Sequence, residues 1–345
     1  MPNKWMVSIA AAAVLLPGGV NNRSTSSAQT RPLLIRMGTS APKDTSPYQE
    51  LKIMAEKWRK APGGGADLVI SNPQGDEAGT VQRIRSGQYQ AAMLSVTGLS
   101  EIDPSVKALE DLPFVFHSLE EVEYVRVKLT PDIEKKFLDK GFVVLFWGDV
   151  GWVRFFSTET MIHPADLKRM KVFTWAGDSK QADIMRAAGF NPVSLPSDAI
   201  LQQLSTGQIN VIPTAPLIAD AGQFYGKAKH MLEINYAPLV GGAVITKEAW
   251  DSIPKASQDA LRKAAQEAGE ALTRRGRAES DASVRAMKTK GGLNVHAVTP
   301  EIEAEWRELA KTIYPKLRGG IVPADLFDRV MSLLESYRAA KGASK

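Results

Sequence analysis

The stretch GFVVLF at residues 141–146 decides the fold class. It is apolar at consecutive positions, which is typical of a strand in the middle of a sheet with helices on both faces. The preceding segment, residues 120–140, has the apolar spacing of a long amphipathic helix. A long helix that leads into a buried strand indicates an α/β protein.

The same alternation extends outward in both directions. The sequence predicts strands over residues 33–37, 68–70, 90–94, 171–173, 192–195 and 209–212, with helical patterns between most of them. This order favours parallel sheets with helices on both faces. Residues 250–290 predict one long helix, and residues 301–338 are largely helical. A chain of 345 residues usually forms two domains, and ligands of such folds lie at the carboxyl ends of strands.

The N-terminus predicts export. Lys4 supplies a positive charge, residues 7–20 form the apolar run VSIAAAAVLLPGGV, and small residues end at Ala28. This pattern is typical of a signal peptide, here cut near Ala28, which places the protein in the periplasm. The alternative is a membrane anchor, but the run is too short to span a bilayer and Pro17 interrupts it. We therefore expect a chain that does not itself span the membrane.

Composition excludes several classes of function. The formal net charge is +5, yet the basic residues are interleaved with acidic ones, so we expect no nucleic-acid partner. There is no cysteine, which excludes thiol nucleophiles and thiolate metal sites. No pattern indicates a cofactor or a metal.

Catalytic motifs are absent from the sequence. It contains neither a G-x-S-x-G elbow nor a phosphate-binding loop, and no two of its four histidines have metal-ligand spacing. Neighbouring carboxylates such as Asp76 and Glu77 more often mark a loop or a solvated face than an acid–base pair, and Asp103 and Asp111 are interpreted as loop and turn acids. We predict that the chain is not an enzyme, although a catalytic set could still be built from distant residues.

Four motifs, in order, resemble one family. They are LPFVF at 112–116, PADLKRMKV at 164–172, LQQLSTGQ at 201–208, and Trp250 followed by Ile253-Pro254. Each is weak alone, but together they cover residues 33 to about 340. In this order the chain resembles the DctP-type periplasmic solute-binding receptors of TRAP transporters.

The resemblance implies an α/β fold of the two-lobe periplasmic-binding-protein type, a clamp with a long helix spanning both lobes. Lobe I would contain residues 30–151 and 241–280, lobe II residues 152–240 and 281–342, and the ligand cleft would lie between them. The ligand implied is a small organic acid, and the partners are the small and large subunits of a TRAP membrane permease. Closure of the lobes around the ligand would be a hinge motion.

The resemblance also implies a site, with one departure. Where the family carries an arginine that forks onto the ligand carboxylate, this chain has Phe173. Arg154 matches a second family arginine and is expected to meet a carboxylate; the alternative is a structural salt bridge. Thr214 stands where the family has an asparagine that contacts the ligand.

The rest of the expected site is aromatic or polar. Phe173 and Trp175 lie two apart on a strand and so share a face, and Trp152 belongs to the same aromatic group. Thr39, Glu77 and Ser95 follow three strands and match the family pocket. The hypothesis is an organic acid or amide whose apolar or aromatic portion stacks on Phe173 or Trp175.

Two rival functions stay open at this point. A ligand-presenting sensory receptor would share every feature above, and an exported hydrolase or lyase on a similar clamp fold would need a catalytic Ser or acid pair in the cleft.

Overall fold

The computed structural model describes residues 32–73 and 75–342. The expected signal peptide, residues 1–28, lies outside the described residues. In the described part of the chain the strands are β1 (Leu33–Thr39), β2 (Ala66–Ser71), β3 (Ala91–Ser95), β4 (Phe142–Ser157), β5 (Lys171–Trp175), β6 (Asn191–Leu195), β7 (Val211–Thr214), β8 (His230–Thr246) and β9 (Asn294–His296).

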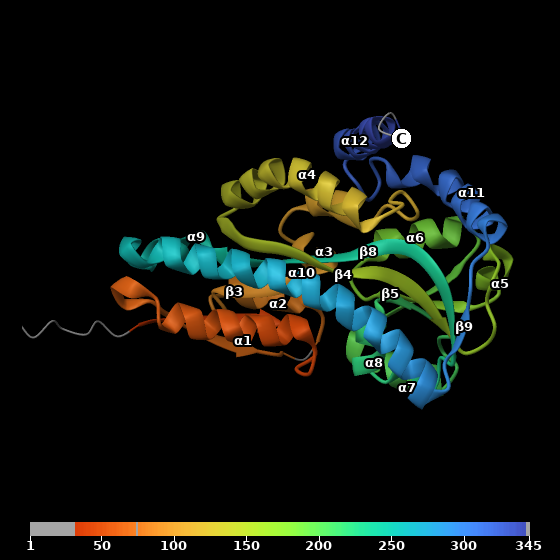
Figure 1. Cartoon of the computed structure of the whole chain (residues 1–345), viewed down its shortest axis with the longest axis horizontal. Coiled ribbons are helices and arrows are strands. Elements are labelled where there is room, and N and C mark those ends of the chain that lie inside the picture. Colours follow the sequence, from red (N-terminus) through yellow and green to blue (C-terminus); the bar gives the residue numbers. More distant parts are fainter. Residues whose placement is uncertain (1–31, 74, 343–345) are drawn as a thin grey trace, which may run out of the picture. The chain divides into compact units, whose positions relative to one another are not determined.

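Helices follow or connect most of these strands (Figure 1). Their bounds are α1 (Ser46–Arg59), α2 (Glu77–Arg85), α3 (Val96–Leu99), α4 (Leu119–Asp139), α5 (Pro164–Lys168), α6 (Ser179–Ala187), α7 (Ile200–Ser205), α8 (Pro216–Ala221), α9 (Lys247–Ser252), α10 (Lys255–Gly291), α11 (Pro300–Leu317) and α12 (Ala324–Gly342). The predicted α/β class is confirmed, and so is the long helix, as α10 with 37 residues.

The strands form one sheet in the order β2-β1-β3-β8-β4-β7-β5-β6, with β9 paired to β8. The pairs β1–β2, β1–β3, β5–β6 and β5–β7 are parallel, whereas β8 is antiparallel to β3 and to β4, and β4 is antiparallel to β7. The prediction of parallel sheets alone is therefore wrong. Strands β4 and β8 are far apart in the sequence, so alternation along the chain gives no sign that they pair.

The two long strands β4 and β8 connect the two parallel sets. Their pairing has register shifts between Val144 and Phe146, between Asp149 and Trp152, and between Val153 and Phe155. Gly151 has φ +89°, a left-handed conformation that a residue with Cβ rarely adopts. The sequence predicts a strand only over residues 141–146, whereas β4 continues through the aromatic residues up to Ser157.

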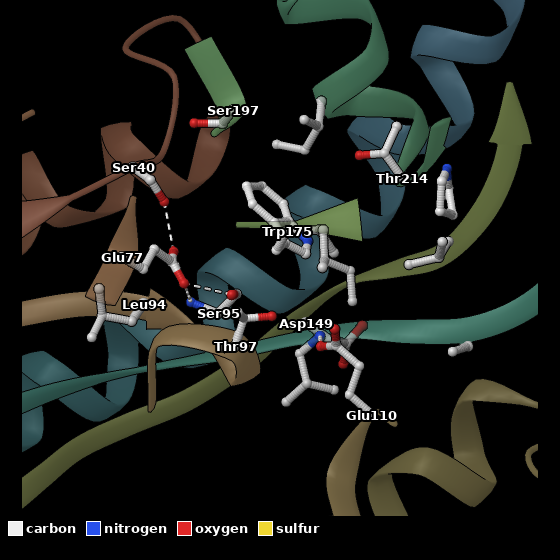
Figure 2. A pocket seen from close by; sticks show the side chains of 18 of the residues that line it. Ser40, Glu77, Leu94, Ser95, Thr97, Glu110, Asp149, Trp175, Ser197 and Thr214 are labelled. Atoms are coloured by element: carbon white, nitrogen blue, oxygen red, sulfur yellow. Dashed lines mark hydrogen bonds between the residues drawn. The ribbon is translucent and has the colours of Figure 1, made fainter. Parts of the chain in front are cut away.

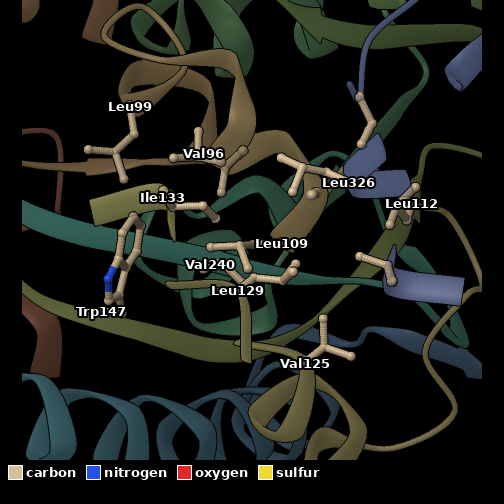
Figure 3. Packing of buried hydrophobic residues seen from close by; sticks show 14 of the residues in the cluster. Val96, Leu99, Leu109, Leu112, Val125, Leu129, Ile133, Trp147, Val240 and Leu326 are labelled. Carbon is tan, nitrogen blue, oxygen red and sulfur yellow. The ribbon is translucent and has the colours of Figure 1, made fainter. Parts of the chain in front are cut away.

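Both faces of the sheet are covered. On β3 and β8, Ala92 and Val244 belong to one buried cluster, whereas Met93 and Ile245 belong to another. This alternation follows from the two-residue period of a strand. In the first cluster, residues of α4 and Leu326 of α12 pack with Trp147 of β4 (Figure 3). The second cluster takes the apolar side chains of α1, α9 and α10.

Helix α10 packs closely along β4 because its contact face carries small residues. A Cβ on Gly269 would lie 2.7 Å from Phe146, and one on Gly276 would lie 2.7 Å from Val150. Leu272 packs in the cluster with α1, and Met287 packs in a third cluster with β5, β7 and α7. A single helix therefore contacts the cores on both sides of the β4–β8 pair.

Candidate ligand-binding site

A cavity of about 550 Å³ opens where strands from both parallel sets end. This volume is typical of a site for a small organic molecule. Its lining includes six of the residues expected from the sequence, namely Thr39, Glu77, Ser95, Phe173, Trp175 and Thr214. Figure 2 shows Glu77 and Ser95 on one side of this space, with Trp175 and Thr214 facing them.

Glu77 is held by a dense set of hydrogen bonds. It begins α2, after Asp76, which caps the helix by accepting from the Gly79 N–H at 2.8 Å. The Glu77 carboxylate accepts from Ser40 Oγ at 2.7 Å, from Ser95 Oγ at 2.6 Å and from backbone N–H groups. These bonds join the ends of β1 and β3 to α2, so Glu77 supports one wall of the cavity.

The aromatic wall comes from β5. The rings of Phe173 and Trp175 meet edge to face, with centroids 5.2 Å apart and planes at 75°. Phe173 is only 2% exposed and packs in the cluster with α7, whereas Trp175 is half-buried. Thr174, between them, bonds Ser194 at 3.0 Å. Trp175 therefore presents more of its ring to the cavity than Phe173.

The structure does not bring Arg154 or Trp152 to the cavity. Val153 lines it instead, and Arg154 Nη1 donates to Glu233 Oε1 at 3.0 Å. The β4–β8 pairing has a register shift between Val153 and Phe155, and in the β4–β7 pairing Arg154 lies opposite Thr214. Trp152 packs against the cluster that contains α4. Arg154 thus has one ion-pair partner here, Glu233, and stands opposite the lining residue Thr214, while its buried Nε has no hydrogen-bond partner among the described residues, so its part in binding stays a prediction.

Four lining acids did not enter the sequence-based site, and one of them is Asp198, in a 3₁₀ turn at Ser197–Ala199 after β6. Glu110 and Asp111 follow a 3₁₀ turn at Pro104–Leu109, and Asp149 lies at the register shift in β4. The sequence predicts Asp111 only as a loop or turn acid, and no spacing in the sequence links it to the other three. Only the folded structure, in which β4 pairs with β8, shows that these acids line the same cavity.

Burial and charge shift the pKa values of two of these acids. Burial raises the pKa of Glu110 well above its usual value, and the neighbouring Asp111 carboxylate raises it further. Burial also raises the pKa of Asp111, and Lys107, 3.0 Å from Asp111 Oδ2, opposes this effect. Lys107 also contacts Asp178 at 2.8 Å. Glu110 Oε2 accepts from the Val240 N–H at 2.7 Å.

Two of the four histidines form a pair that the sequence analysis missed. His230 Nδ1 lies 2.9 Å from His296 Nε2, and the rings are stacked at 5.2 Å. They are 66 residues apart and meet because β9 pairs with β8. Neither residue lines the cavity. Across residues 32–73 and 75–342, no group of three or more His, Cys, Asp or Glu is placed to hold a metal ion.

None of the helices in the described ranges is both long enough and apolar enough to cross a membrane. The most extended helix, α10, carries charged residues along its length.

Comparison with known proteins gives a consistent result. The family model DctP, described as bacterial extracellular solute-binding protein, family 7, matches residues 37–319. The C4-dicarboxylate-binding periplasmic protein DctP of Rhodobacter capsulatus is 22% identical over 294 residues, which cover 84% of this chain and 88% of that protein.

Solved structures have the same fold. A TRAP periplasmic solute-binding protein from Shewanella oneidensis with bound succinate has a TM-score of 0.80 at 17% identity, covering 88% of this chain and 99% of that one. One from Ralstonia eutropha H16 with bound (S)-2-acetolactate has a TM-score of 0.80 at 20% identity, with the same coverage. At these identities the likeness establishes the fold.

Proposed function

The chain belongs to the DctP family of bacterial extracellular solute-binding proteins, and from this premise we propose that it captures one small organic solute in the cavity described above and delivers it to a TRAP membrane permease. Proteins of this family bind small organic acids, work with membrane permease subunits and are periplasmic. They are binding proteins, so the prediction that the chain is not an enzyme is confirmed at the level of the family.

Export is the first part of the proposal. The N-terminal pattern, with Lys4, an apolar run and small residues up to Ala28, supports a cleaved signal peptide. N-terminal sequencing of the protein from the periplasm should then begin at Gln29. A first residue far from Gln29, or retention of Met1, would contradict this part alone.

The two-lobe division is the second part. We place lobe I at residues 30–151 and 241–280, and lobe II at residues 152–240 and 281–342. The boundaries near residues 151 and 241 fall close to the register shift between Asp149 and Trp152, where the β4–β8 pairing is interrupted. An interruption of this kind is a suitable hinge, because a few residues there absorb the change in backbone angles.

The observation that supports the proposal is that the cavity is lined by residues from both sets of parallel strands. In the proposed division, Thr39, Glu77 and Ser95 fall in lobe I and Phe173, Trp175 and Thr214 in lobe II, and all six line one cavity. A solute in that cavity would contact both lobes and so favour their closed arrangement.

The test is retention of a solute by the exported protein. The protein is equilibrated by dialysis with an extract of small metabolites, washed and denatured, and the released compounds are identified by mass spectrometry. Trp175→Ala should lose the retained compound, because it removes the exposed aromatic wall. The matched control, Trp152→Ala, changes a tryptophan outside the cavity lining and should keep it. Retention of nothing by the unmodified protein would contradict the proposal.

A further inference from the structure

One side chain of the cavity wall, Glu110, is a carboxyl group with a single hydrogen bond. Among the described residues this bond comes from the Val240 N–H, which lies 2.7 Å from Oε2. Val240 is the β8 partner of Asp149 in the β4–β8 pairing, and Figure 2 shows Glu110 and Asp149 on the same side of the cavity. The second oxygen, Oε1, is therefore available to a solute on a side chain that lines the cavity.

Two cations near this part of the wall are engaged by other carboxylates. Arg277 donates two hydrogen bonds to Asp149. Lys107 contacts Asp111 at 3.0 Å and Asp178 at 2.8 Å, so its single charge already serves two carboxylates. The carboxyl group that precedes Asp111 in the chain is thus without a cation in contact in the described part of the protein.

The surroundings of Glu110 favour its neutral form. Burial disfavours an ionised carboxylate because it removes water, and the adjacent Asp111 carboxylate repels a second negative charge. Both effects raise the pKa of Glu110 well above its usual value, and Glu77 adds to them, whereas the Val240 hydrogen bond and the charge of Lys107 oppose them. A neutral carboxyl group carries an O–H donor, which an ionised one lacks.

A neutral Glu110 explains how a cavity with acids in its wall can hold an organic acid. The lining also contains Glu77, Asp111, Asp149 and Asp198. A negative charge on Glu110 would repel the carboxylate of a solute beside it. The neutral form instead offers its O–H to a solute oxygen, and such a hydrogen bond to a carboxylate is shorter and stronger than one between two neutral groups.

Resting on the solute capture proposed above, we propose that Glu110 is a specificity-determining residue: as a neutral carboxylic acid, it donates a hydrogen bond from Oε1 to an oxygen of the bound organic acid. The proton stays on Glu110, and Oε2 continues to accept from the Val240 N–H. The site therefore selects a solute that places an acceptor oxygen at this position over one that places an apolar group there.

The first measurement is made on the protein without a solute. Infrared spectra of the unmodified protein and of Glu110→Gln are recorded at about pH 7.5, where an ordinary glutamate is ionised, and one is subtracted from the other. A neutral carboxyl group has a C=O band that a carboxylate lacks. We expect this band in the unmodified protein and its loss in Glu110→Gln. Loss of a carboxylate band in its place would overturn the inference.

The second measurement is calorimetry with three probe acids, benzoate, phenylpyruvate and succinate, and the tightest binder is used with each variant. Glu110→Gln offers an amide oxygen to Val240 and an N–H to the probe, so it should bind within about threefold of the unmodified protein. Glu110→Leu removes the donor and should weaken binding about tenfold or more. The matched control, Glu101→Leu, changes an exposed glutamate outside the cavity lining and should alter the affinity less than about twofold. Melting curves verify that each variant is folded.

Three results of the calorimetry would contradict the role of Glu110. Binding about tenfold tighter in Glu110→Gln would show that an ionised carboxylate repels the acid. An unchanged affinity in folded Glu110→Leu would show that the side chain does not contact the acid. No saturable binding of any of the three acids would also overturn the inference. Solute capture itself still stands in each case if the dialysis experiment retains a compound, and both proposals fail if it retains nothing.

Discussion

Arg277 on α10 donates two parallel hydrogen bonds to Asp149 on β4, from Nε to Oδ1 at 2.7 Å and from Nη2 to Oδ2 at 2.6 Å. The Asp149 side chain is 1% exposed, so this ion pair is largely removed from water. Asp149 lies where the β4–β8 pairing is interrupted, so the ion pair attaches helix α10 to β4 at this interruption. The hydrogen bonds to Asp149, together with its negative charge, raise the pKa of the Arg277 guanidinium.

Breaking this pair should be costly. Arg277→Leu leaves the Asp149 carboxylate buried without its partner, and we expect the free energy of unfolding to fall by about 3 kcal/mol. The measurement is urea denaturation near neutral pH. Arg274→Leu changes an exposed arginine of the same helix and should cost less than about 0.5 kcal/mol. Equal losses in the two variants would show that the pair has no special role.

Arg154→Ala separates the structural role from ligand binding. Because Arg154 pairs with Glu233 and does not line the cavity, its removal should change the affinity for the retained solute less than about twofold. Stability should fall by about 1 kcal/mol, as for a partly exposed ion pair. Calorimetry with the solute identified by dialysis measures the first effect. A loss of about 2–5 kcal/mol of binding would instead place Arg154 on a ligand carboxylate.

Glu110→Gln should stabilise the protein at neutral and higher pH. The pKa of Glu110 is raised by burial and by Asp111, so the folded state binds this proton more tightly than the unfolded chain, whose value is near 4.5. The group therefore lowers stability progressively as pH rises above 4.5. Glu77 adds to this effect and Lys107 opposes it, while the hydroxyl of Tyr236, whose own pKa is raised by burial, stays neutral.

Melting temperatures of the unmodified protein and of Glu110→Gln, measured without ligand from acid to mildly alkaline pH, check this sign. The two should coincide near pH 4.5 and diverge above it, with the variant higher. A variant that is less stable at high pH would show that the ionised carboxylate is favoured in the folded state.

His230 should titrate below the usual pKa of a histidine. Burial lowers the pKa of His230 below 6.5, and a charge on His296 lowers it further, whereas Glu159 opposes this. The neutral form is thus favoured in the folded state, and its stabilising contribution is lost as pH falls below 6.5. Imidazole resonances followed by NMR should show the low value, and His296→Asn should raise it.

His163→Asn is the control for this titration, because His163 pairs with Glu305 and lies apart from the His230–His296 pair. It should leave the pKa of His230 unchanged. A His230 pKa at or above 6.5 in the unmodified protein would contradict the assignment.

The polar and aromatic ends of strands could be predicted from the sequence. Thr39, Ser95, Trp175 and Thr214 were expected at the site and line the cavity, because strand ends of an α/β sheet gather at one place. Their part in binding remains a prediction. The four family motifs also led to the correct fold, because they occur along the chain in the order of the helices and strands to which they belong.

The other parts of the site could not be predicted, because they depend on contacts between residues that are far apart in the sequence. Val153 lines the cavity although its neighbour Arg154 is the residue that the family pattern points to, and no spacing in the sequence reports this. Glu110 enters the site because Val240, 130 residues later, supplies its hydrogen bond. The two members of the His230–His296 pair are likewise far apart in the sequence, by 66 residues, so no local pattern indicates that they meet.

The central claim is that the cavity between the strand ends captures one small organic solute. The most direct measurement is the crystal structure of the protein after dialysis against the metabolite extract, with the retained compound identified in parallel by mass spectrometry. We predict one solute molecule per chain, enclosed between Ser95 and the ring of Trp175. A compound bound elsewhere, or an empty cavity in protein that retains a solute, would contradict the account.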